Sequence, residues 1–517
     1  MRNAAIFLLL IPSAYFAWNQ RDQPGFGKNH DDAILFASAK SLAAGEGFVI
    51  PSLPERPAQT KYPVLYPLYL SAVWRINPHF PANLQVATWF AWPLLAICQA
   101  LAWFYWRAEG IGTWRTRTVV AMLAVNPYMI LFGASLFSEV FFMCWLFAAL
   151  LAARKETLAA ALFAGIFAGC AYLSRTAGIA LLVSMPAWYF WRRDFRRAMA
   201  FVAGMLPFVL GWNLWTALHR IHVTEATLAD YTDYVKFEFM NVGLDNLAIV
   251  LWKNIDALLY SIGSLVVPQV VALQPVKILT EVIAIAMIAG VVRLARRGVA
   301  VPYAVFALVS SLMLIAWHFP PTERFVLPMF PLLAAGLVVE LENLARGIRG
   351  AFHHKDMSQR VVAAGFSVVV VAIFATSLGL QLFVGFRAMP EDASNDRTQL
   401  AETRATYAWI AEHALPPAAV LSNNDPLLYL YTGRTGNAAP FLPRWWYAGD
   451  GEKMFDFFRG VTPYCKSRRI GYILATSNDL RRWGAEEKGR IFAILERDSE
   501  LVRIYQAPSG AAVYRVN

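Results

Sequence analysis

Residues 29–70 read NHDDAILFASAKSLAAGEGFVIPSLPERPAQTKYPVLYPLYL, and this stretch decides how the rest of the chain is interpreted. Two adjacent carboxylates, Asp31 and Asp32, follow closely on the first apolar segment. The same polar loop ends with Lys61-Tyr62-Pro63. Ionisable groups at the ends of membrane segments are costly unless they are paired or solvated, so they are candidates for function. The two acids and the lysine therefore mark the first loop as a candidate site.

The composition predicts a membrane protein. Of the 517 residues, 58% are hydrophobic and only 16% are charged. Soluble domains lack this balance, and repeated apolar runs of about 20 residues are typical of a polytopic helical protein. The net charge of +11 does not indicate a nucleic-acid partner, because the basic residues fall in short loops between apolar runs. Such a distribution is a topology signal.

The positive charges orient the apolar segments. Eleven segments are predicted to cross the membrane, at about 4–18, 83–106, 117–134, 137–153, 157–173, 176–191, 198–218, 275–292, 300–317, 325–341 and 361–386. The proline-interrupted run 62–76 is predicted to lie on the membrane surface, because a crossing there would place basic clusters such as Arg192–Arg197 outside. The amphipathic run 246–272 is expected on the outer surface. The first segment is interpreted as a retained anchor, although small residues leave a cleaved signal peptide open.

Two domains are expected. Residues 1–387 form a transmembrane helical bundle with a large first outer loop, 19–82, and residues 388–517 form a small outer α/β domain. Within the second domain, the patterns predict the helices 397–414, Asp425–Tyr431, 450–460 and 487–496, and the strands Ala418–Leu421, Tyr472–Thr476, Leu501–Gln506 and Ala512–Val516. The domain has no Walker loop and no glycine-rich dinucleotide motif.

The predicted topology places several ionisable residues on the same outer side, although they are far apart in sequence. These candidates are Asp31, Asp32, Lys61, Glu139, Arg175, His318, Glu323 and Arg324. The acid pair has two interpretations: it caps the helix Ala33–Ala43, or one acid acts as a general base while the other orients a substrate. Lys61 either snorkels to the interface or binds a lipid phosphate.

The later candidates also have structural alternatives. Glu139 either complements a helix dipole or accepts hydrogen bonds from sugar hydroxyls. Arg175 either pairs with an acid such as Glu139 or Asp32, or binds phosphate. Arg324 is a phosphate-binding candidate with Glu323 as its possible structural partner, and His318 is interpreted first as an interfacial hydrogen-bonding residue. No His/Cys/Asp cluster has metal-ligand spacing, so the sequence does not require a divalent ion.

These residues resemble a known superfamily. The order Asp31-Asp32, Ala39-Lys40-Ser41-Leu42, Gly45 and Lys61-Tyr62-Pro63-Val64-Leu65-Tyr66 resembles the first loop of GT-C integral-membrane glycosyltransferases. The pattern is most similar to the protein O-mannosyltransferases and the lipid A aminoarabinose transferases. Ser138-Glu139, Ser174-Arg175 and the segment 323–328 are similar to later landmarks of that superfamily. The likeness covers about residues 1–345, and Val64 stands where a second proline is usual.

The resemblance implies a function. It implies an inverting hexosyl- or pentosyltransferase that takes a monosaccharide from a polyprenyl-phosphate donor, such as undecaprenyl phosphate, without a further cofactor. Asp31 would be the base, and Lys61 and an arginine would hold the phosphate. Tyr62, which follows Lys61 in the motif, is a further substrate-binding candidate. The acceptor would be a lipid, glycan or protein at the outer face of a multi-pass protein in the bacterial inner membrane. A lipid-linked-sugar flippase and a membrane sensor with an outer ligand-binding domain are the alternatives.

Overall fold

The computed structural model describes the chain apart from residues 1–7, 222–225, 234–236, 238–245, 269–273, 353–356, 416–418, 440–446, 448 and 450. Contacts divide it into two compact units. Unit 1 consists of Met1–Asn19, Ala91–Gly211 and Val250–Glu391, and unit 2 of Gln20–Phe90, Trp212–Ile249 and Asp392–Asn517. The first loop therefore shares a unit with the C-terminal residues. The expected division at residue 387 stays a prediction.

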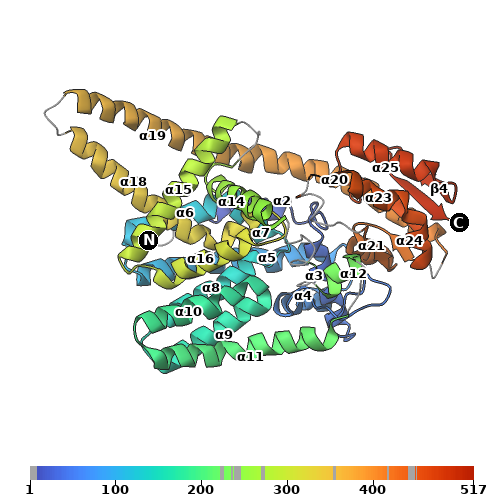
Figure 1. Cartoon of the computed structure of the whole chain (residues 1–517), viewed down its shortest axis with the longest axis horizontal. Coiled ribbons are helices and arrows are strands. Elements are labelled where there is room, and N and C mark those ends of the chain that lie inside the picture. Colours follow the sequence, from blue (N-terminus) through green and yellow to red (C-terminus); the bar gives the residue numbers. More distant parts are fainter. Residues whose placement is uncertain are drawn as a thin grey trace. The chain divides into compact units, whose positions relative to one another are not determined.

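Unit 1 is helical. Its helices, in chain order, are α2 (Ile11–Asn19), α5 (Asn83–Ala108), α6 (Thr113–Val125), α7 (Pro127–Ala134), α8 (Glu139–Ala153), α9 (Leu158–Ser174), η1 (Thr176–Ile179), α10 (Ala180–Trp191), α11 (Phe195–His219), α14 (Leu247–Ser264), α15 (Gln274–Arg296), α16 (Val301–Ile315), α17 (Glu323–Val326), η3 (Leu327–Met329), α18 (Phe330–Phe352), α19 (Met357–Phe383) and the π-helical turn η4 (Val384–Ala388). Helices α5 and α11 each have one end in unit 2. Helices α8, α9 and α10 lie side by side (Figure 1).

Length and composition identify candidate membrane spans. Among the residues that the structure describes, five helices are long and apolar enough to cross a bilayer, and a sixth span results if α6 and α7 count as one. Four shorter apolar helices begin at Glu139, Leu158, Thr176 and Val301. Each of the eleven segments predicted from the sequence overlaps a helix. The exact number of crossings stays a prediction, because a 15-residue helix rises only about 22 Å against a hydrocarbon core of about 30 Å.

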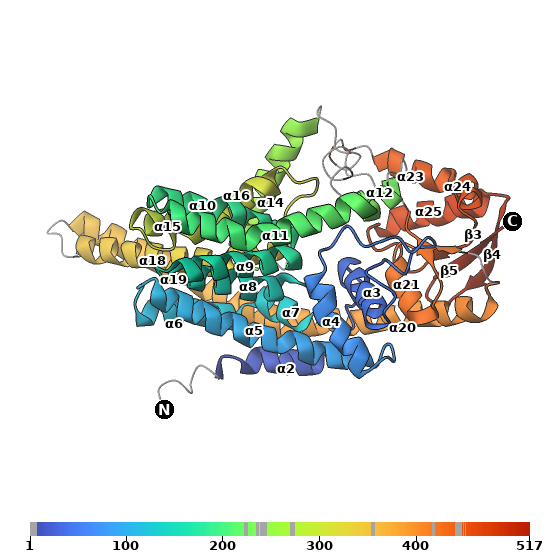
Figure 2. The same ribbon diagram turned by 90° about the horizontal axis from the view of Figure 1, so that it is seen from below.

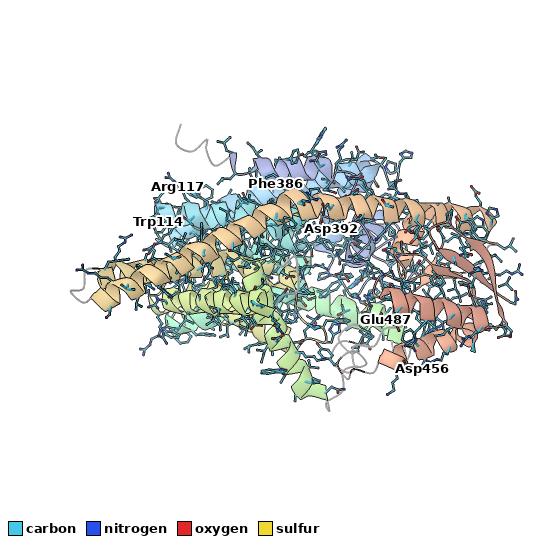
Figure 3. The ribbon with its side chains drawn as sticks, turned by 90° about the horizontal axis from the view of Figure 1, so that it is seen from above. Trp114, Arg117, Phe386, Asp392, Asp456 and Glu487 are labelled. Carbon is cyan, nitrogen blue, oxygen red and sulfur yellow. The ribbon has the colours of Figure 1, made fainter. Side chains whose placement is uncertain are left out.

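The surface of unit 1 fits a lipid environment. Large apolar side chains on α19 remain outside the packed interior, and Val362 and Val368 are 70% and 69% exposed. An extended apolar surface of this kind marks contact with membrane or protein. On α6, Trp114 and Arg117 point outward, as Figure 3 shows. Together these features support an integral membrane protein.

Small residues set the helix packing in unit 1. An added Cβ at Gly290 of α15 would lie 2.0 Å from the backbone oxygen of Gly336 on α18. An added Cβ at Gly165 of α9 would lie 2.1 Å from the backbone oxygen of Phe201 on α11. Backbones approach this closely only where side chains are absent, which is a common device of membrane helix pairs.

The predicted crossing 117–134 is bent by 59° between α6 and α7. Pro127 begins α7 and has no N–H to continue the helix. Asn126 caps the new helix, since its side chain accepts a hydrogen bond of 3.1 Å from the backbone N–H of Met129. Residues 117–134 were predicted from the sequence as one apolar run, and this bend was not predicted.

Unit 2 contains the first loop and the C-terminal α/β structure. The loop carries α3 (Asp31–Ala43) and α4 (Leu65–Ile76), and α12 (Ala226–Thr232) lies in the later polar stretch. Helix α3 begins at Asp31, two residues earlier than predicted, so the acid pair forms its first turn. The 12-residue α4 rises about 18 Å, which is too short to span a bilayer alone. Of the predicted amphipathic run 246–272, residues 269–272 lie outside the described part.

A five-stranded sheet forms the C-terminal part of unit 2. Its strand order is β2-β1-β3-β5-β4. The strands and their helices are α20 (Met389–His413), β1 (Ala419–Leu421), α21 (Asp425–Thr432), β2 (Gly436–Asn437), α23 (Gly451–Arg459), α24 (Val461–Ser467), β3 (Ile470–Ala475), α25 (Ala485–Arg497), β4 (Leu501–Gln506) and β5 (Ala512–Val516). Strand β1 is parallel to β2 and β3, and β5 is antiparallel to β3 and β4.

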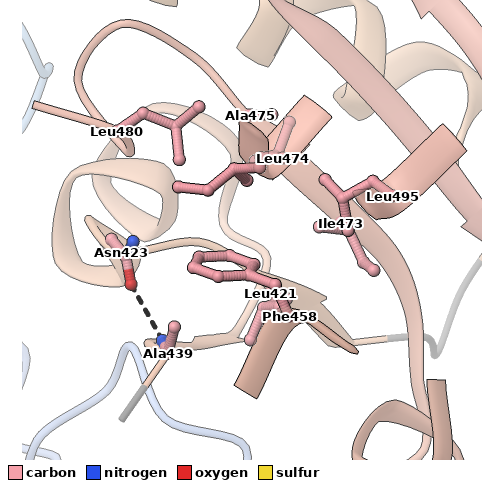
Figure 4. A pocket seen from close by; sticks show the side chains of 10 residues that line it. Leu421, Asn423, Ala439, Phe458, Ile473, Leu474, Ala475, Leu480 and Leu495 are labelled. Atoms are coloured by element: carbon pink, nitrogen blue, oxygen red, sulfur yellow. Dashed lines mark hydrogen bonds between the residues drawn. The ribbon is translucent and has the colours of Figure 1, made fainter. Parts of the chain in front are cut away.

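The sheet packs on one hydrophobic cluster. Val461, Ile473, Ile491 and Tyr514 are buried in it, and Figure 2 shows α23, α24 and α25 together on one side of the sheet. A pocket beside this core is lined by apolar side chains apart from Asn423, which accepts a hydrogen bond of 2.8 Å from the backbone of Ala439 (Figure 4).

The expected α/β pattern is confirmed in most of its elements. Both C-terminal strands have the predicted bounds, and Gly433 ends α21 in the left-handed conformation with φ of 71°. Helix α20 begins eight residues before the predicted start at residue 397. The short strand β2 and helix α24 were not predicted. Ala418, the predicted first residue of β1, lies outside the described residues.

Candidate functional site

Asp31 and Tyr62 form the centre of a cluster in unit 2. The Tyr62 hydroxyl donates a hydrogen bond of 2.5 Å to Oδ1 of Asp31. Asp31 is partly exposed, so its carboxylate lies at a surface that a substrate can reach. The two residues come from opposite ends of the first loop, and the phenol fixes the orientation of the carboxylate. The structure thus brings together two residues that are 31 positions apart in the first loop.

Asp32 has a different environment from Asp31. Its side chain is buried, with 2% exposure, and Oδ2 accepts a hydrogen bond of 2.9 Å from the backbone N–H of Gly27. Its Oδ1 accepts a hydrogen bond of 3.0 Å from the backbone N–H of Ala33. A buried carboxylate with backbone donors on both oxygens holds the loop. The geometry therefore distinguishes the two acids. Asp31 is partly exposed, whereas Asp32 is buried and bonded to the backbone on both sides of Asp31.

Lys61 lies beside Tyr62, the residue that bonds Asp31. Its Nζ donates a hydrogen bond of 2.8 Å to Oδ1 of Asp230, at the end of α12. The same ammonium lies 5.6 Å from the ring centres of both Tyr62 and Tyr231. Only 9% of the Lys61 side chain and 28% of the Asp230 side chain is exposed. The ammonium group of Lys61 is thus held in place and largely shielded from water. Its counter-ion, Asp230, was not predicted from the sequence.

Gln59 fixes the backbone of Lys61 and Tyr62. Its side-chain oxygen accepts hydrogen bonds of 3.0 and 3.2 Å from the N–H groups of these two residues. Its side-chain nitrogen donates 3.1 Å to Ser38 of α3. Gln59 is fully buried. The oxygen and the nitrogen of the Gln59 amide are thus both hydrogen-bonded. Through these bonds Gln59 connects the segment that carries Lys61 to α3, the helix that begins with the acid pair.

His30, Tyr231 and Asp425 make a second network in unit 2. The Tyr231 hydroxyl donates a hydrogen bond of 2.5 Å to Oδ1 of Asp425 and lies 2.8 Å from Nε2 of His30. His30 Nε2 lies 3.2 Å from the same carboxylate oxygen. Burial, together with the neighbouring Asp425 carboxylate, raises the pKa of Tyr231, so the phenol keeps its proton at neutral pH.

Glu139, Arg175 and Arg324 form the corresponding cluster in unit 1. Oε1 of the fully buried Glu139 accepts hydrogen bonds from both guanidinium groups, at the first residue of α8. The two arginine side chains are 15% and 14% exposed. Arg324 also stacks on Phe137, with its guanidinium carbon 4.3 Å from the ring centre. One carboxylate against two guanidinium groups leaves a net positive charge, which suits an anion.

The structure resolves the alternatives for these residues in part. Arg175 pairs with Glu139, which is one of the two predicted pairings. Arg324 also pairs with Glu139, while Glu323 accepts a hydrogen bond of 2.8 Å from Ser264. That Glu323 is a further partner of Arg324 stays a prediction. His318 is 4% exposed and lies between aromatic rings, with centroid distances of 5.1 Å to Trp317 and 4.2 Å to Phe319.

The predicted site residues fall into two groups. Asp31, Asp32, Lys61 and Tyr62 belong to unit 2, and Glu139, Arg175, His318, Glu323 and Arg324 belong to unit 1. In unit 2, Tyr62 contacts Asp31 and Lys61, and in unit 1 Glu139 contacts Arg175 and Arg324. Among the residues the structure describes, no three or more His, Cys, Asp or Glu side chains are placed to hold a metal ion.

Comparisons with known proteins give a structural likeness only. No family model matches the chain, and no curated protein matches it. Two solved structures of ArnT from Cupriavidus metallidurans are similar. The one bound to undecaprenyl phosphate has a TM-score of 0.47 at 11% identity, and the apo one has 0.48 at 10%. Each similarity covers 94% of this chain and 93% of the other.

Sequence reasoning missed several residues around the first loop. Asp230 and Tyr231 stand in a polar stretch without a recognisable motif, and Asp425 looks like an ordinary helix start before Pro426. Gln59 lies two residues before Lys61, but nothing in its neighbours marks it as buried. Their importance depends on contacts between segments far apart in sequence, and only the structure shows these contacts.

Proposed function

We propose that the chain is a membrane glycosyltransferase that moves a monosaccharide from a polyprenyl-phosphate donor to an acceptor at the outer face of the membrane. One observation carries the proposal. The acid that begins α3 and the lysine at the far end of the same loop are brought together, with Tyr62 bonded to Asp31 and adjacent to Lys61. A partly exposed carboxylate beside a fixed ammonium provides both a base and a phosphate-binding charge.

The reaction assigns a separate task to each group. Asp31 removes the proton from the acceptor hydroxyl or amine while that atom attacks C1 of the sugar. The bond between C1 and the phosphate oxygen breaks, and the electron pair leaves with the polyprenyl phosphate. Displacement from the face opposite the phosphate inverts C1. No covalent enzyme intermediate is needed.

Lys61 stabilises the phosphate as negative charge develops on it. Fixed positive charge is most effective where water is partly excluded, and the Lys61 side chain is 9% exposed. Arg175 or Arg324 supplies a second charge in this proposal, because Glu139 neutralises only one of the two guanidinium groups. Asp32 keeps Asp31 in place through the Gly27 backbone. Glu139, His318 and Glu323 are the candidate substrate-binding residues of unit 1 in this proposal.

Two experiments test this function. Purified protein in nanodiscs is incubated with short-chain polyprenyl-phosphate sugars, and release of polyprenyl phosphate is measured. Mass spectrometry of envelope lipids, glycans and glycoproteins with and without the gene then identifies the acceptor. Donor-dependent release and loss of one glycosylated product support the proposal. Movement of intact donor between leaflets without C1–O cleavage would instead show a flippase.

A further inference from the structure

The carboxyl edge of the parallel strands in the C-terminal domain contacts the first loop. Strand β1 ends at Leu421 and is followed by the polar residues 422–425. In open α/β sheets this edge is the usual place for ligands. Here Asn424 donates a hydrogen bond of 2.7 Å to the backbone oxygen of Gly27, and Arg481 donates one of 2.9 Å to that of Lys28. The edge therefore holds a protein segment, namely the one that leads into Asp31.

Gly27 is shaped for this contact. Its φ of +83° is a conformation that side chains rarely adopt. An added Cβ would lie 3.0 Å from Leu427 and 3.2 Å from Asn424, both at the start of α21. The N–H of the same glycine bonds Asp32. Asn424, Gly27 and Asp32 thus form a continuous connection from the C-terminal sheet to the first turn of α3.

Asp425 makes a second connection, through a single oxygen. Its Oδ1 contacts His30, the residue before Asp31, and Tyr231, the residue after the Lys61 partner Asp230. Asp425 is fully buried, and its Oδ2 has no hydrogen-bond partner among the described residues. A buried acid with one unsatisfied oxygen costs stability, so core packing alone does not account for it.

Asp479 of the same edge shows the contrast. It is also buried, with 4% exposure. Its Oδ1 accepts a hydrogen bond of 2.6 Å from Ser422, and its Oδ2 accepts one of 2.6 Å from Thr476. Both oxygens are satisfied by residues of its own sheet edge. Asp479 is a structural acid of the domain, whereas Asp425 is bonded to segments outside it.

We propose that Asp425 is a positioning residue that sets the catalytic acid and the phosphate-binding lysine relative to each other, so that the C-terminal domain is a working part of the active site. The proposal deepens the proposed function and rests on it for the roles of Asp31 and Lys61. Through His30 the Asp425 carboxylate fixes the approach to Asp31, and through Tyr231 it fixes the helix that carries Asp230.

The kinetic test compares three variants, each normalised to its folded fraction. Asp425→Ala should lower kcat by about 10²-fold, the effect of misplacing reacting groups by about 1 Å. Asp425→Asn keeps an oxygen that accepts the hydrogen bond from the Tyr231 hydroxyl, so this variant should keep most of the wild-type kcat. Asp479→Ala, the matched control, should lower the melting temperature while leaving kcat within about threefold. Equal kcat losses in Asp425→Ala and Asp479→Ala would overturn the positioning role.

Hydrogen exchange supplies a readout that does not depend on turnover. Asp425→Ala should accelerate amide exchange in residues 27–33 of the full-length protein, and Asp479→Ala should leave those amides unchanged. Unaltered exchange in Asp425→Ala would remove the connection whatever the activity. If the wild type transfers no sugar, the proposed function fails, while the exchange result still decides whether Asp425 orders the Asp31 segment.

Discussion

The Lys61–Asp230 pair allows a prediction with an unusual sign. If Lys61 binds the donor phosphate, Asp230 competes with that phosphate, so Asp230→Asn should tighten donor binding while Lys61→Ala weakens it. At the observed separation of 2.8 Å, the Coulomb attraction is about 6 kcal/mol at an effective dielectric constant of about 20. Most of it is offset by desolvation and side-chain ordering, and comparable pairs contribute about 1 kcal/mol.

About 1 kcal/mol corresponds to a roughly fivefold tighter Kd in Asp230→Asn. Lys61→Ala removes a charged hydrogen bond, which is typically worth about 1.5–3 kcal/mol, so its Kd should rise by roughly ten- to a hundredfold. The assay is equilibrium binding of a labelled polyprenyl-phosphate sugar in nanodiscs at two salt concentrations. The gain in Asp230→Asn should shrink at high salt. If Asp230→Asn weakens binding as much as Lys61→Ala does, the positioning of Lys61 by Asp230 outweighs any competition with the phosphate, and the competition argument is refuted.

Three further variants test separate parts of the structure. Tyr62→Phe removes the hydrogen bond to Asp31 and should lower kcat by roughly ten- to a hundredfold at unchanged donor Kd, since a bond to a charged group is worth about 1.5–3 kcal/mol. An unchanged kcat would show that the phenol does not orient the base. Glu139→Gln leaves two arginines without their buried counter-ion, so the free energy of unfolding should fall by about 3–5 kcal/mol. A melting temperature equal to that of the wild type would contradict the claim that Glu139 neutralises these arginines. Gly290→Ala should lower the melting temperature, because its Cβ would lie 2.0 Å from the backbone oxygen of Gly336. Gly365→Ala is the control, because its Cβ would meet nothing within 4 Å. Equal melting temperatures for the two variants would refute the close contact between α15 and α18.

The sequence predicted most of the helices because their signals are local. Each apolar run overlaps a helix, and turn residues such as Gly433 end elements where the pattern indicated. The bend at Pro127 was missed because a proline inside an apolar run is compatible with either a kink or a continuous helix. The two-residue strand β2 carries no periodicity at all, so only its pairing with β1 defines it.

The candidate site was predicted unevenly for the same physical reason. Asp31 and Lys61 stood out because charges are rare in this chain, and rarity is visible in sequence. The pairing of Arg324 with Glu139 was not predicted, because the two residues are far apart in sequence. Asp425 resembled an N-terminal helix residue, and its contacts to His30 and Tyr231 depend on how unit 2 folds.

The most direct test of the account is the turnover of Asp31→Asn with a short-chain polyprenyl-phosphate sugar, measured beside Asp32→Asn and the wild type. Asn keeps the size of the side chain and can still accept the Tyr62 hydrogen bond, but it is not a base. A general base contributes typically about 10²–10⁴-fold, so Asp31→Asn should lose about that much kcat at wild-type donor Kd and melting temperature. Asp32→Asn perturbs the buried hydrogen bond from the Gly27 N–H, so this variant should also have a lower melting temperature than the wild type. Near-wild-type turnover in folded Asp31→Asn would contradict the central claim.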